Sequence, residues 1–265
     1  MRPVTIVSLL VWDSVRYLDN LLRNLEAYRP GNGFHLRILD QGSGPETLAL
    51  LRAFDARHPW VSVEYLDANI GYSAGHNRNF EAMRRTGHFD YFVTINNDLI
   101  FGEPGWLDTL VTGMEAAPSA AVGGPVCYVS EPGLIRPATR AEKEAGQFFF
   151  VNGSVAIIRA AAVRRFGLFD EIYTPAYWED ADMCMRYKHF GLRDVYIDIP
   201  MFHAYLGEIE RVNQAKNAEL LARHGDFRTR NMHLFYERWA TVAQRARFPA
   251  EPGLRAGCPQ LYIPD

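Results

Sequence analysis

The sequence predicts an α/β protein in which a mostly parallel central sheet is covered by helices on both faces. Between residues 4 and 121, short continuous apolar runs alternate with segments whose apolar residues recur at helical spacing. Strands that alternate with helices in this way form parallel sheets whose two faces are both buried. The chain of 265 residues is 48% apolar and 13% aromatic, so it has the material for a large hydrophobic core.

The first half of the chain consists of strands that are each followed by a helix. Ser14 is placed to cap the first helix, and Pro45 opens the second at a position where proline is tolerated. Further helices are expected at 73–85 and 106–114. Ligands bind at the carboxyl ends of parallel strands, so the loops after the strands are where a site is expected. The expected strands are Val4–Trp12, Leu36–Leu39, Val61–Tyr65 and Tyr91–Ile95.

The second half of the chain has a different pattern. Ser130–Gly146 combines prolines and glycines with a charged run, which predicts a loop or a short helix. Phe148–Ile158 predicts a strand with Gly153 inside it, and such a glycine is typical of a close approach by a ligand or another backbone. The remaining elements are two helices, a last strand and a C-terminal helical extension, expected at Ala160–Phe166, Glu179–Phe190, Asp194–Ile199 and 207–265.

Composition and charge exclude several classes of protein. The 28 lysines and arginines stand against 31 aspartates and glutamates, and this net charge of −3 argues against a nucleic-acid partner. Cys127, Cys184 and Cys258 are odd in number and far apart, which favours a reducing compartment over a disulfide framework or a thiolate zinc site. No run of 18 apolar residues occurs, so a cytoplasmic protein without a membrane span is expected.

Two polar loops of the first half are candidates for binding. Asn96-Asn97-Asp98 ends an expected strand, where a carboxylate can bind a divalent cation or the residues can simply form a turn. Asn69–Arg78 brings glycines to a helix start, where backbone N–H groups can bind a phosphate. Any strand-to-helix connection can look similar, and Arg78 can equally contact phosphate or lie solvated on the helix surface.

Two further signals lie in the second half. The segment 178–182, Trp-Glu-Asp-Ala-Asp, places carboxylates at a helix start, where they also stabilise the helix dipole. The aromatic residues beside them can desolvate a carboxylate and raise its pKa, which suits a general base. Asp180 and Asp182 point in different directions on the helix, so only one of them is expected to face a reaction. His203 follows the last strand and can bind a metal or pack among aromatic residues.

Taken in order, these signals resemble the motifs of family 2 inverting glycosyltransferases of the GT-A fold. Asp40-Gln41-Gly42-Ser43 is similar to D-N-x-S, and Asn69 to Asn77 matches N-x-G-x-x-x-G-x-N, the most specific match. Asn96-Asn97-Asp98 takes the place of D-x-D without its first aspartate, and residues 178–186 resemble E-D-x-D-x-x-x-R. The chain looks most like the bacterial rhamnosyltransferase-type enzymes that build surface polysaccharides, over about residues 4–206.

The resemblance implies inverting transfer of a sugar, with rhamnose as the candidate, from a nucleoside-diphosphate sugar to a hydroxyl of a glycan or lipid-linked glycan. It implies that Asp180 is the catalytic base, and we place Trp178, Glu179 and Gly153 beside the acceptor. The donor-binding residues that it implies are Asp40, Ser43, Asn69, Gly71, Gly75, Asn77, Arg78, Asn96 and Asn97.

The resemblance also implies a cofactor and a domain arrangement. A divalent cation, Mg²⁺ or Mn²⁺, would be held by Asp98 and His203. The implied GT-A domain, with its Rossmann-like sheet, covers residues 1–206, as a donor half at 1–121 and an acceptor half at 122–206. In the helical extension, Tyr236-Glu237-Arg238-Trp239 is similar to a Tyr/Phe-x-x-Lys-Trp segment seen near the end of such chains.

Other functions are compatible with parts of the pattern. A non-catalytic nucleotide-sugar-binding module would explain Gln41 and the missing first aspartate, whereas the intact Glu179-Asp180 pair argues against it. A sugar nucleotidyltransferase would carry an early glycine-rich basic loop, and Leu9–Tyr17 contains no glycine. Glu208–Arg247 carries eight basic and five acidic residues, which fits peripheral attachment to the inner face of a membrane or an ordinary solvated helix face.

Overall fold

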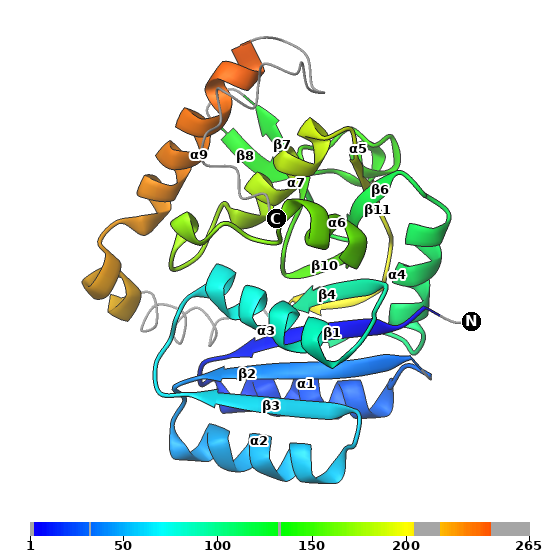
Figure 1. Ribbon diagram of the computed structural model, residues 1–265, viewed down its shortest axis with the longest axis vertical. Coiled ribbons are helices and arrows are strands. Elements are labelled where there is room, and N and C mark those ends of the chain that lie inside the picture. The colour runs from blue at the N-terminus through cyan, green and yellow to red at the C-terminus, as the bar shows by residue number, and fades with distance from the viewer. Residues whose placement is uncertain (1–2, 32, 132–133, 204–217, 245–265) are drawn as a thin grey trace.

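A seven-stranded sheet forms the centre of the molecule in the order β11-β6-β10-β4-β1-β2-β3 (Figure 1). The computed structural model describes residues 3–31, 33–131, 134–203 and 218–244. β1 pairs in parallel with β2 and β4, whereas β10 runs antiparallel to its neighbours β4 and β6. The predicted mostly parallel sheet is therefore confirmed. Its strands are β1 (Thr5–Val11), β2 (Phe34–Gln41), β3 (Val61–Leu66), β4 (Tyr91–Ile95), β6 (Ala120–Gly124), β10 (Val155–Arg159) and β11 (Arg193–Tyr196).

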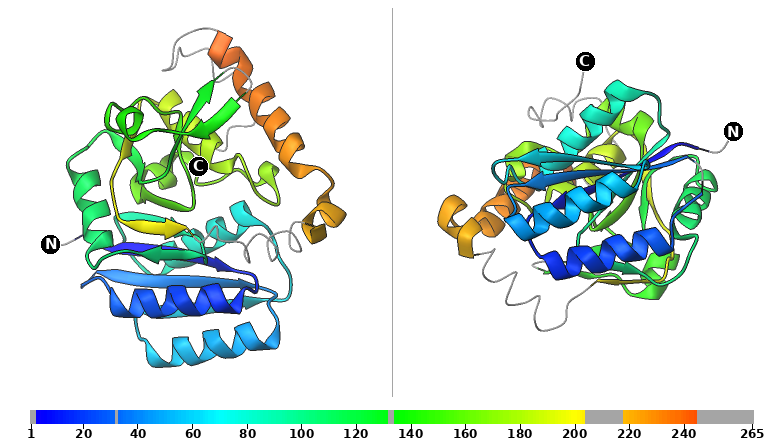
Figure 2. Two further views of the ribbon diagram at one scale, coloured as in Figure 1. Left: turned by 180° about the vertical axis from the view of Figure 1, so that it is seen from behind. Right: turned by 90° about the horizontal axis from the view of Figure 1, so that it is seen from below.

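Helices cover both faces of this sheet because alternate side chains of each strand point to opposite faces. In β1, Ile6 packs into one hydrophobic cluster, whereas Val7 and Leu9 pack into the other. Figure 2 shows α1 and α2 on the face opposite to α3. One hydrophobic cluster lies under α1 (Val15–Ala27), α2 (Pro45–Arg57) and α4 (Trp106–Glu115). The other lies under α3 (Tyr72–Thr86), α6 (Ala160–Phe166) and α7 (Glu179–His189).

The structure differs from the sequence prediction at the start of the first helix and in the segment Ser130–Gly146. Ser14 does not cap α1 with its side chain, because its φ of 68° places it in the left-handed region. The segment expected as a loop or short helix contains the strands β7 (Cys127–Glu131) and β8 (Leu134–Pro137) as well as the short helix α5 (Arg140–Glu144). Strand β7 pairs with β8, so part of this segment belongs to a small second sheet.

Two expected strands have different bounds in the structure. Phe148–Ile158 forms β9 (Phe150–Val151) and β10, since β9 pairs with β7 while β10 joins the central sheet. Residues 152–154 connect them. The expected strand Asp194–Ile199 corresponds to β11, which ends at Tyr196. A separate strand, β12 (Met201–His203), follows it and pairs with β5 (Leu99–Phe101). The pairing of β12 with β5 brings residues 98 and 203 to the same edge of the molecule.

The C-terminal helix α9 (Phe227–Gln244) packs against the α7 side of the molecule (Figure 1). Phe235 and Trp239 are each 2% exposed and belong to the same hydrophobic cluster as α7. The other parts of the expected extension, 207–217 and 245–265 with Cys258, lie outside the described residues. Cys127 and Cys184 are buried free thiols. In the described ranges, no helix combines the length and the apolar character that crossing a bilayer requires.

Candidate functional site

Polar loops surround a pocket of about 210 Å³ at the carboxyl ends of the parallel strands. The register explains why these loops meet: Val11 at the end of β1 pairs with Asp40 of β2, and Leu9 pairs with Ile95 at the end of β4. Loops that are far apart in sequence therefore start side by side. The pocket is lined by Leu10, Trp12, Gln41, Asn69, Tyr72, Ile95, Asn96, Asn97, Pro175, Ala176 and Leu220.

The two predicted metal ligands lie next to each other at this edge. Oδ1 of Asp98 is 3.1 Å from Nε2 of His203, although 105 residues separate them, because His203 pairs with Leu99 across the β12–β5 ladder. Their side chains are 18% and 16% exposed. Nδ2 of Asn96 lies 3.5 Å from the same imidazole nitrogen. Among the described residues, no group of three or more His, Cys, Asp or Glu side chains is arranged to hold a metal.

The loop after β2 is tied to the loop after β1. Asp40 is fully buried; its Oδ2 accepts from the backbone N–H of Ser43 at 3.3 Å, and its Oδ1 has no hydrogen-bond partner in the described part of the chain. Oγ of Ser43 accepts from the N–H of Asp13 at 2.8 Å, and Oδ1 of Asp13 accepts from the N–H of Gly44 at 2.7 Å. Asp13 was not among the predicted site residues. Its place directly after β1 was the signal that could have identified it.

The glycine loop before α3 is held in a compact turn. Oδ1 of Asn69 accepts from the N–H of Gly71 at 2.8 Å. Gly71 has a φ of +93°, and a Cβ there would lie 3.0 Å from the carbonyl oxygen of Pro175, so glycine is required. Oε1 of the buried Gln41 accepts from the N–H of residue 70 at 3.1 Å. Gln41, the departure from D-N-x-S, therefore anchors this loop. A Cβ on Gly75 would lie 2.9 Å from Leu10.

Of the nine predicted donor-binding residues, Asn69, Asn96 and Asn97 line the pocket, whereas the side chains of Asn77 and Arg78 contact other parts of the protein. Nδ2 of Asn77 donates to the carbonyl oxygen of Phe169 at 2.9 Å and to Oε1 of Glu171 at 3.0 Å. Arg78 pairs with Glu64 at 2.6 Å, and its side chain is half exposed. Both side chains leave α3 on faces that point away from the strand ends, so we propose no direct donor contact for either. Asn97 does line the pocket, where its Nδ2 lies 3.5 Å from the carbonyl oxygen of residue 13.

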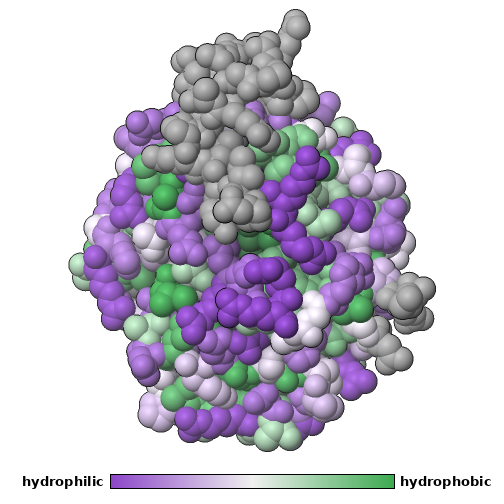
Figure 3. Space-filling view, viewed as in Figure 1, coloured by the Kyte–Doolittle hydropathy of each residue, from purple (hydrophilic) through white to green (hydrophobic). Residues whose placement is uncertain are grey.

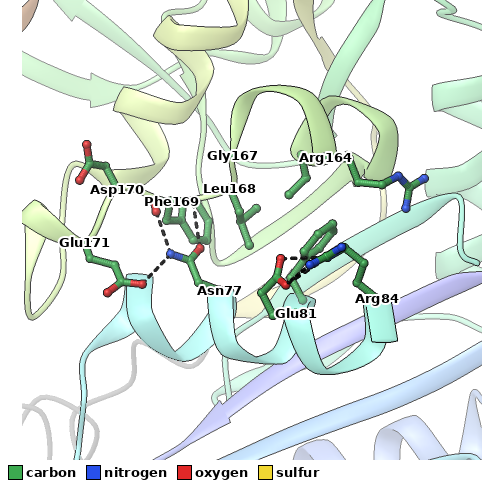
Figure 4. A pocket seen from close by; sticks show the side chains of 11 residues that line it. Asn77, Glu81, Arg84, Arg164, Gly167, Leu168, Phe169, Asp170 and Glu171 are labelled. Carbon is green, nitrogen blue, oxygen red and sulfur yellow. Dashed lines mark hydrogen bonds and ion pairs between the residues drawn. The ribbon is translucent and has the colours of Figure 1, made fainter. Parts of the chain in front are cut away.

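A larger cavity of about 730 Å³ lies beside α3 (Figure 4). It separates α3 from the segment 163–171, and Asn77 bridges the two. Polar groups along its wall pair with each other, as Glu81 does with Arg84 at 2.7 Å. Figure 3 shows hydrophilic side chains gathered in the middle of this side of the molecule. Because this cavity does not adjoin the strand-end carboxylates, it is not the candidate site.

Glu179 and Asp180 begin α7 and are 5% and 6% exposed. Oδ2 of Asp180 accepts from Nδ2 of Asn152 at 2.9 Å and from the N–H of Gly153 at 3.0 Å, and its Oδ1 accepts from the N–H of Ala181 at 2.8 Å. Oε2 of Glu179 has no hydrogen-bond partner within the described ranges. Burial and the neighbouring Asp180 raise the pKa of Glu179 well above its ordinary value.

The pair therefore divides its protons unequally. Burial also raises the pKa of Asp180, but the hydrogen bonds from residues 152, 153 and 181 oppose that rise. Glu179 lacks such donors at Oε2. We infer that the shared proton resides on Glu179, which leaves Asp180 as the ionised member that can accept a proton.

Position 153, beside Asp180, is a glycine for a steric reason. A Cβ at this position would lie 2.7 Å from the hydroxyl oxygen of Tyr72, which donates to the carbonyl of Gly153 at 2.7 Å. Oγ1 of Thr94 donates to the same carbonyl at 2.7 Å. The glycine within a strand-like run indicated a close approach by a ligand or another backbone, and the group that approaches it in the structure is the Tyr72 side chain. Asn152 and Tyr72, which contact the same region, were not predicted because an asparagine and a tyrosine carry no comparable signal.

Asp182, two residues further along α7, points into the protein. It is fully buried and accepts from the Tyr173 hydroxyl at 3.0 Å, from Nη1 of Arg238 at 2.9 Å and from Nε1 of Trp239 at 2.9 Å. Arg186 donates to the carbonyl oxygens of residues 166 and 168 at 2.6 and 2.8 Å. Asp182, Arg186 and the 236–239 segment therefore join α9 and α6 to α7, as expected if only Asp180 faces a reaction.

Replacing Glu179 with glutamine should make the stability of the protein less sensitive to pH. Unfolded Glu179 ionises near 4.5, whereas in the folded protein its pKa is raised. Between these two values the folded protein holds a proton that the unfolded chain has lost, so wild-type stability falls as pH rises, by at most about 1.4 kcal/mol per pH unit. Urea unfolding between pH 5 and 8 should show the advantage of Glu179→Gln growing with pH. Glu46→Gln, an exposed change in the first turn of α2, is the control; parallel wild-type and Glu179→Gln curves would contradict the expectation.

Comparisons with known proteins identify the family. The sequence profile of glycosyl transferase family 2 matches residues 11–173. Among solved structures, the mannosyltransferase PcManGT from Pyrobaculum calidifontis, in complex with GDP-Man and Mn²⁺, is 15% identical with a TM-score of 0.66, covering 98% of this chain and 68% of that one. GalNAc-T7 with UDP, GalNAc and Mn²⁺ is 12% identical with a TM-score of 0.65, covering 78% and 44%. Curated protein sequences give no match. Since the family profile matches more than half of the residues and the fold agrees, the chain belongs to glycosyl transferase family 2.

Proposed function

We propose that the protein transfers a sugar from a nucleoside-diphosphate sugar to an acceptor hydroxyl, with inversion at the anomeric carbon. The observation that carries this proposal is the convergence of the end of β2 and the loops after β1, β3 and β4 with the segment that leads into Glu179 and Asp180. Pro175 and Ala176 of that segment line the same pocket as Asn69, Asn96 and Asn97. A donor-binding edge and the segment that leads into the candidate base thus line one pocket.

The donor side of the site consists of the loops after β2 and β3. Oδ1 of buried Asp40, which has no hydrogen-bond partner among the described residues, is the acceptor for an N–H group of the nucleotide base, and Ser43 holds the neighbouring loop in place. The Asn69–Gly71 turn brings backbone close to the pocket, and Gly75 allows α3 to approach β1. Asn96 and Asn97 supply amide donors at the pocket wall for sugar or phosphate oxygens.

Asp98 and His203 fit a divalent cation. A carboxylate and an imidazole lie 3.1 Å apart at a partly exposed edge, and Mg²⁺ or Mn²⁺ usually takes few protein ligands while the substrate phosphates and water supply the others. Both structural neighbours named above contain Mn²⁺. When bound, such a cation neutralises negative charge on the leaving nucleoside diphosphate.

Asp180 is the base of the proposed reaction. Its carboxylate accepts the proton of the acceptor hydroxyl while that oxygen forms a bond to the anomeric carbon, and the bond from this carbon to the diphosphate oxygen breaks. The products are the new glycoside and a nucleoside diphosphate, with the proton on Asp180. Glu179, Trp178 and the backbone of Gly153 surround the base on the acceptor side. Asn152, which donates to Asp180, joins this group.

The finer identity of the substrates follows from the resemblance of the sequence. We propose rhamnose as the first sugar to test and a glycan or lipid-linked glycan of surface polysaccharide synthesis as the acceptor. A lipid-linked acceptor would place the protein at the inner face of the membrane. Residues 208–247, with their basic excess, are the segment that we would assign to such a contact.

Binding of a nucleoside diphosphate should raise the melting temperature in a metal-dependent manner. A ligand at 100 times its dissociation constant stabilises a folded protein by about 2.7 kcal/mol. UDP, GDP, dTDP and CDP should each be tested with Mn²⁺ and with EDTA, and one of them is expected to give a shift that EDTA removes. Asp98→Ala should abolish the metal-dependent part, whereas Asp108→Ala on the exposed face of α4 should not. No shift with any nucleotide would favour a binding module that has lost its donor site.

A further inference from the structure

The segment 174–178 leads directly into α7, and the side chain of Asn231 on α9 binds the backbone of this region at residues 173 and 176. Asn231 is fully buried. Its Nδ2 donates to the carbonyl oxygens of Tyr173 at 2.9 Å and Ala176 at 3.0 Å, and the carbonyl oxygen of Tyr177 lies at 3.3 Å. An amide nitrogen has two hydrogens, so the two short contacts already use its donor capacity. The family profile ends at residue 173 and does not reach α9.

The two carbonyls between residues 173 and 176 also accept hydrogen bonds. Arg230, the neighbour of Asn231 on α9, donates to the carbonyl oxygen of Thr174. The N–H of Tyr72, at the start of α3, donates to the carbonyl oxygen of Pro175 at 2.7 Å. The segment therefore has a hydrogen-bond partner at each successive carbonyl from residue 173 to 176. These partners come from α9 on one side and from the donor-side loop on the other.

The conformation that these bonds hold is an unfavourable one. Tyr177 and Trp178 have φ values of 75° and 80°, in the left-handed region that residues with a Cβ seldom adopt. Two such residues in succession persist only where the surroundings over-determine the backbone. α9 also contacts both side chains. The ring centroids of Trp178 and Phe235 are 4.9 Å apart, and those of Tyr177 and Phe227, which stack, are 6.0 Å apart.

The strained pair determines where α7 starts. Trp178 is the N-cap residue of α7, and Glu179 and Asp180 are the first two residues of the helix. A relaxed segment would rotate the first turn of α7 and move the carboxyl group of Asp180 away from Asn152 and Gly153. Because reacting groups must be aligned closely, a displacement of about 1 Å is enough to cost a factor of about 100 in rate.

We propose that Asn231 is a positioning residue, which fixes the segment 174–178 and thereby aims Asp180 at the acceptor hydroxyl. This proposal rests on the function proposed above. Asn231 touches neither the donor loops nor the candidate metal ligands in the described contacts. Its loss should therefore lower turnover without weakening nucleotide binding.

The test compares Asn231→Ala and Asn231→Asp with the wild-type full chain. Asn231→Asp keeps the shape but cannot donate to the carbonyls. Release of nucleoside diphosphate is measured with the nucleotide sugar whose nucleotide stabilises the wild type, and rates are divided by the nucleotide-binding stoichiometry. Both variants should lower kcat by about 10- to 100-fold per nucleotide-binding site, with the donor KM changed less than about 2-fold. Dividing by the stoichiometry removes any effect of a smaller folded fraction.

Two control variants separate positioning from loss of stability. His233→Ala changes an exposed residue of the same helix, and Leu110→Ala destabilises the core under α4, far from the segment. Neither should change kcat per binding site. Unchanged kcat in both Asn231 variants would overturn the proposal, and so would an equal loss of kcat in Leu110→Ala.

Hydrogen exchange supplies a readout that does not depend on activity. In both Asn231 variants, amides of the peptide spanning residues 173–182 should exchange at least 10-fold faster than in the wild type, while those of β1 and β4 keep their rates. Unaltered exchange in 173–182 would overturn the proposal even if the wild type proved to cleave no nucleotide sugar. Faster exchange together with a wild type that binds no nucleotide would instead show that the positioning is real and that the proposed function is wrong.

Discussion

Asp180→Asn should lower sugar transfer by a factor of about 10² to 10⁴, which is the usual contribution of a positioned general base. The amide cannot take up the proton of the acceptor hydroxyl, but it has nearly the same size and can still accept a hydrogen bond from Asn152 or Gly153. Transfer is measured as release of nucleoside diphosphate and as formation of the glycoside. The melting-temperature shift caused by nucleotide and Mn²⁺ should stay within about 1 °C of the wild-type shift, since Asp180 makes no contact with the donor loops.

Asp108→Asn is the matched control for this experiment, because it makes the same chemical change at an exposed residue of α4. Its rate should equal that of the wild type. Near-normal transfer by Asp180→Asn would mean that another group accepts the proton, and Glu179 would then be the next residue to replace. A loss of nucleotide binding in Asp180→Asn would instead indicate that the variant is misfolded around α7.

Asp182→Ala should destabilise the protein by about 3–5 kcal/mol. The change removes the acceptor of two α9 side chains and of Tyr173, and it leaves Arg186 buried without its carboxylate partner. Removing one partner of a buried ion pair costs this much because the remaining charge keeps its desolvation penalty. Urea unfolding followed by circular dichroism measures the loss, and Trp239, whose indole N–H donates to Asp182, reports undocking of α9 by fluorescence.

An exposed ion pair of the same helical spacing provides the comparison. Asp19 pairs with Arg23 on α1 at 2.8 Å, with side chains that are 35% and 75% exposed. Asp19→Ala should cost less than about 1 kcal/mol, because water and salt screen an exposed pair. If Asp182→Ala costs no more than Asp19→Ala, the buried cluster does not anchor α9.

Much of the fold could be predicted because hydrophobic periodicity is local. Leu18, Leu21, Leu22 and Leu25 recur at helical spacing, and all four are buried in α1. The run Tyr91–Ile95 is apolar except for Thr94, and β4 is buried at every position. The division of Phe148–Ile158 into two strands was not predictable in this way. Both pieces are apolar, and only their different strand partners show that they belong to different sheets.

The candidate site divides along the same line. The motif residues at the ends of strands or directly after them, such as Asp40 and Asn96–Asp98, lie together at the carboxyl ends of the strands as predicted, because parallel strands end together. Asn77 and Arg78 belong to the same motif but lie inside α3, where the helical rotation turns them toward Phe169 and Glu64. A motif records spacing along the chain, and within a helix that spacing does not say which side faces the ligand.

The sequence by itself determined the α/β class, the order of the elements in the first half, the loops that gather at the strand ends and the carboxylates that begin α7. The tertiary structure decided which of these residues meet. It brought His203 to Asp98 across 105 residues, directed Asp182 inward to α9 while Asp180 remained beside Gly153, and placed Asn231 against the segment before α7. The reason is physical: secondary structure follows from local spacing and burial, whereas contacts between distant residues depend on how strands pair and how helices pack.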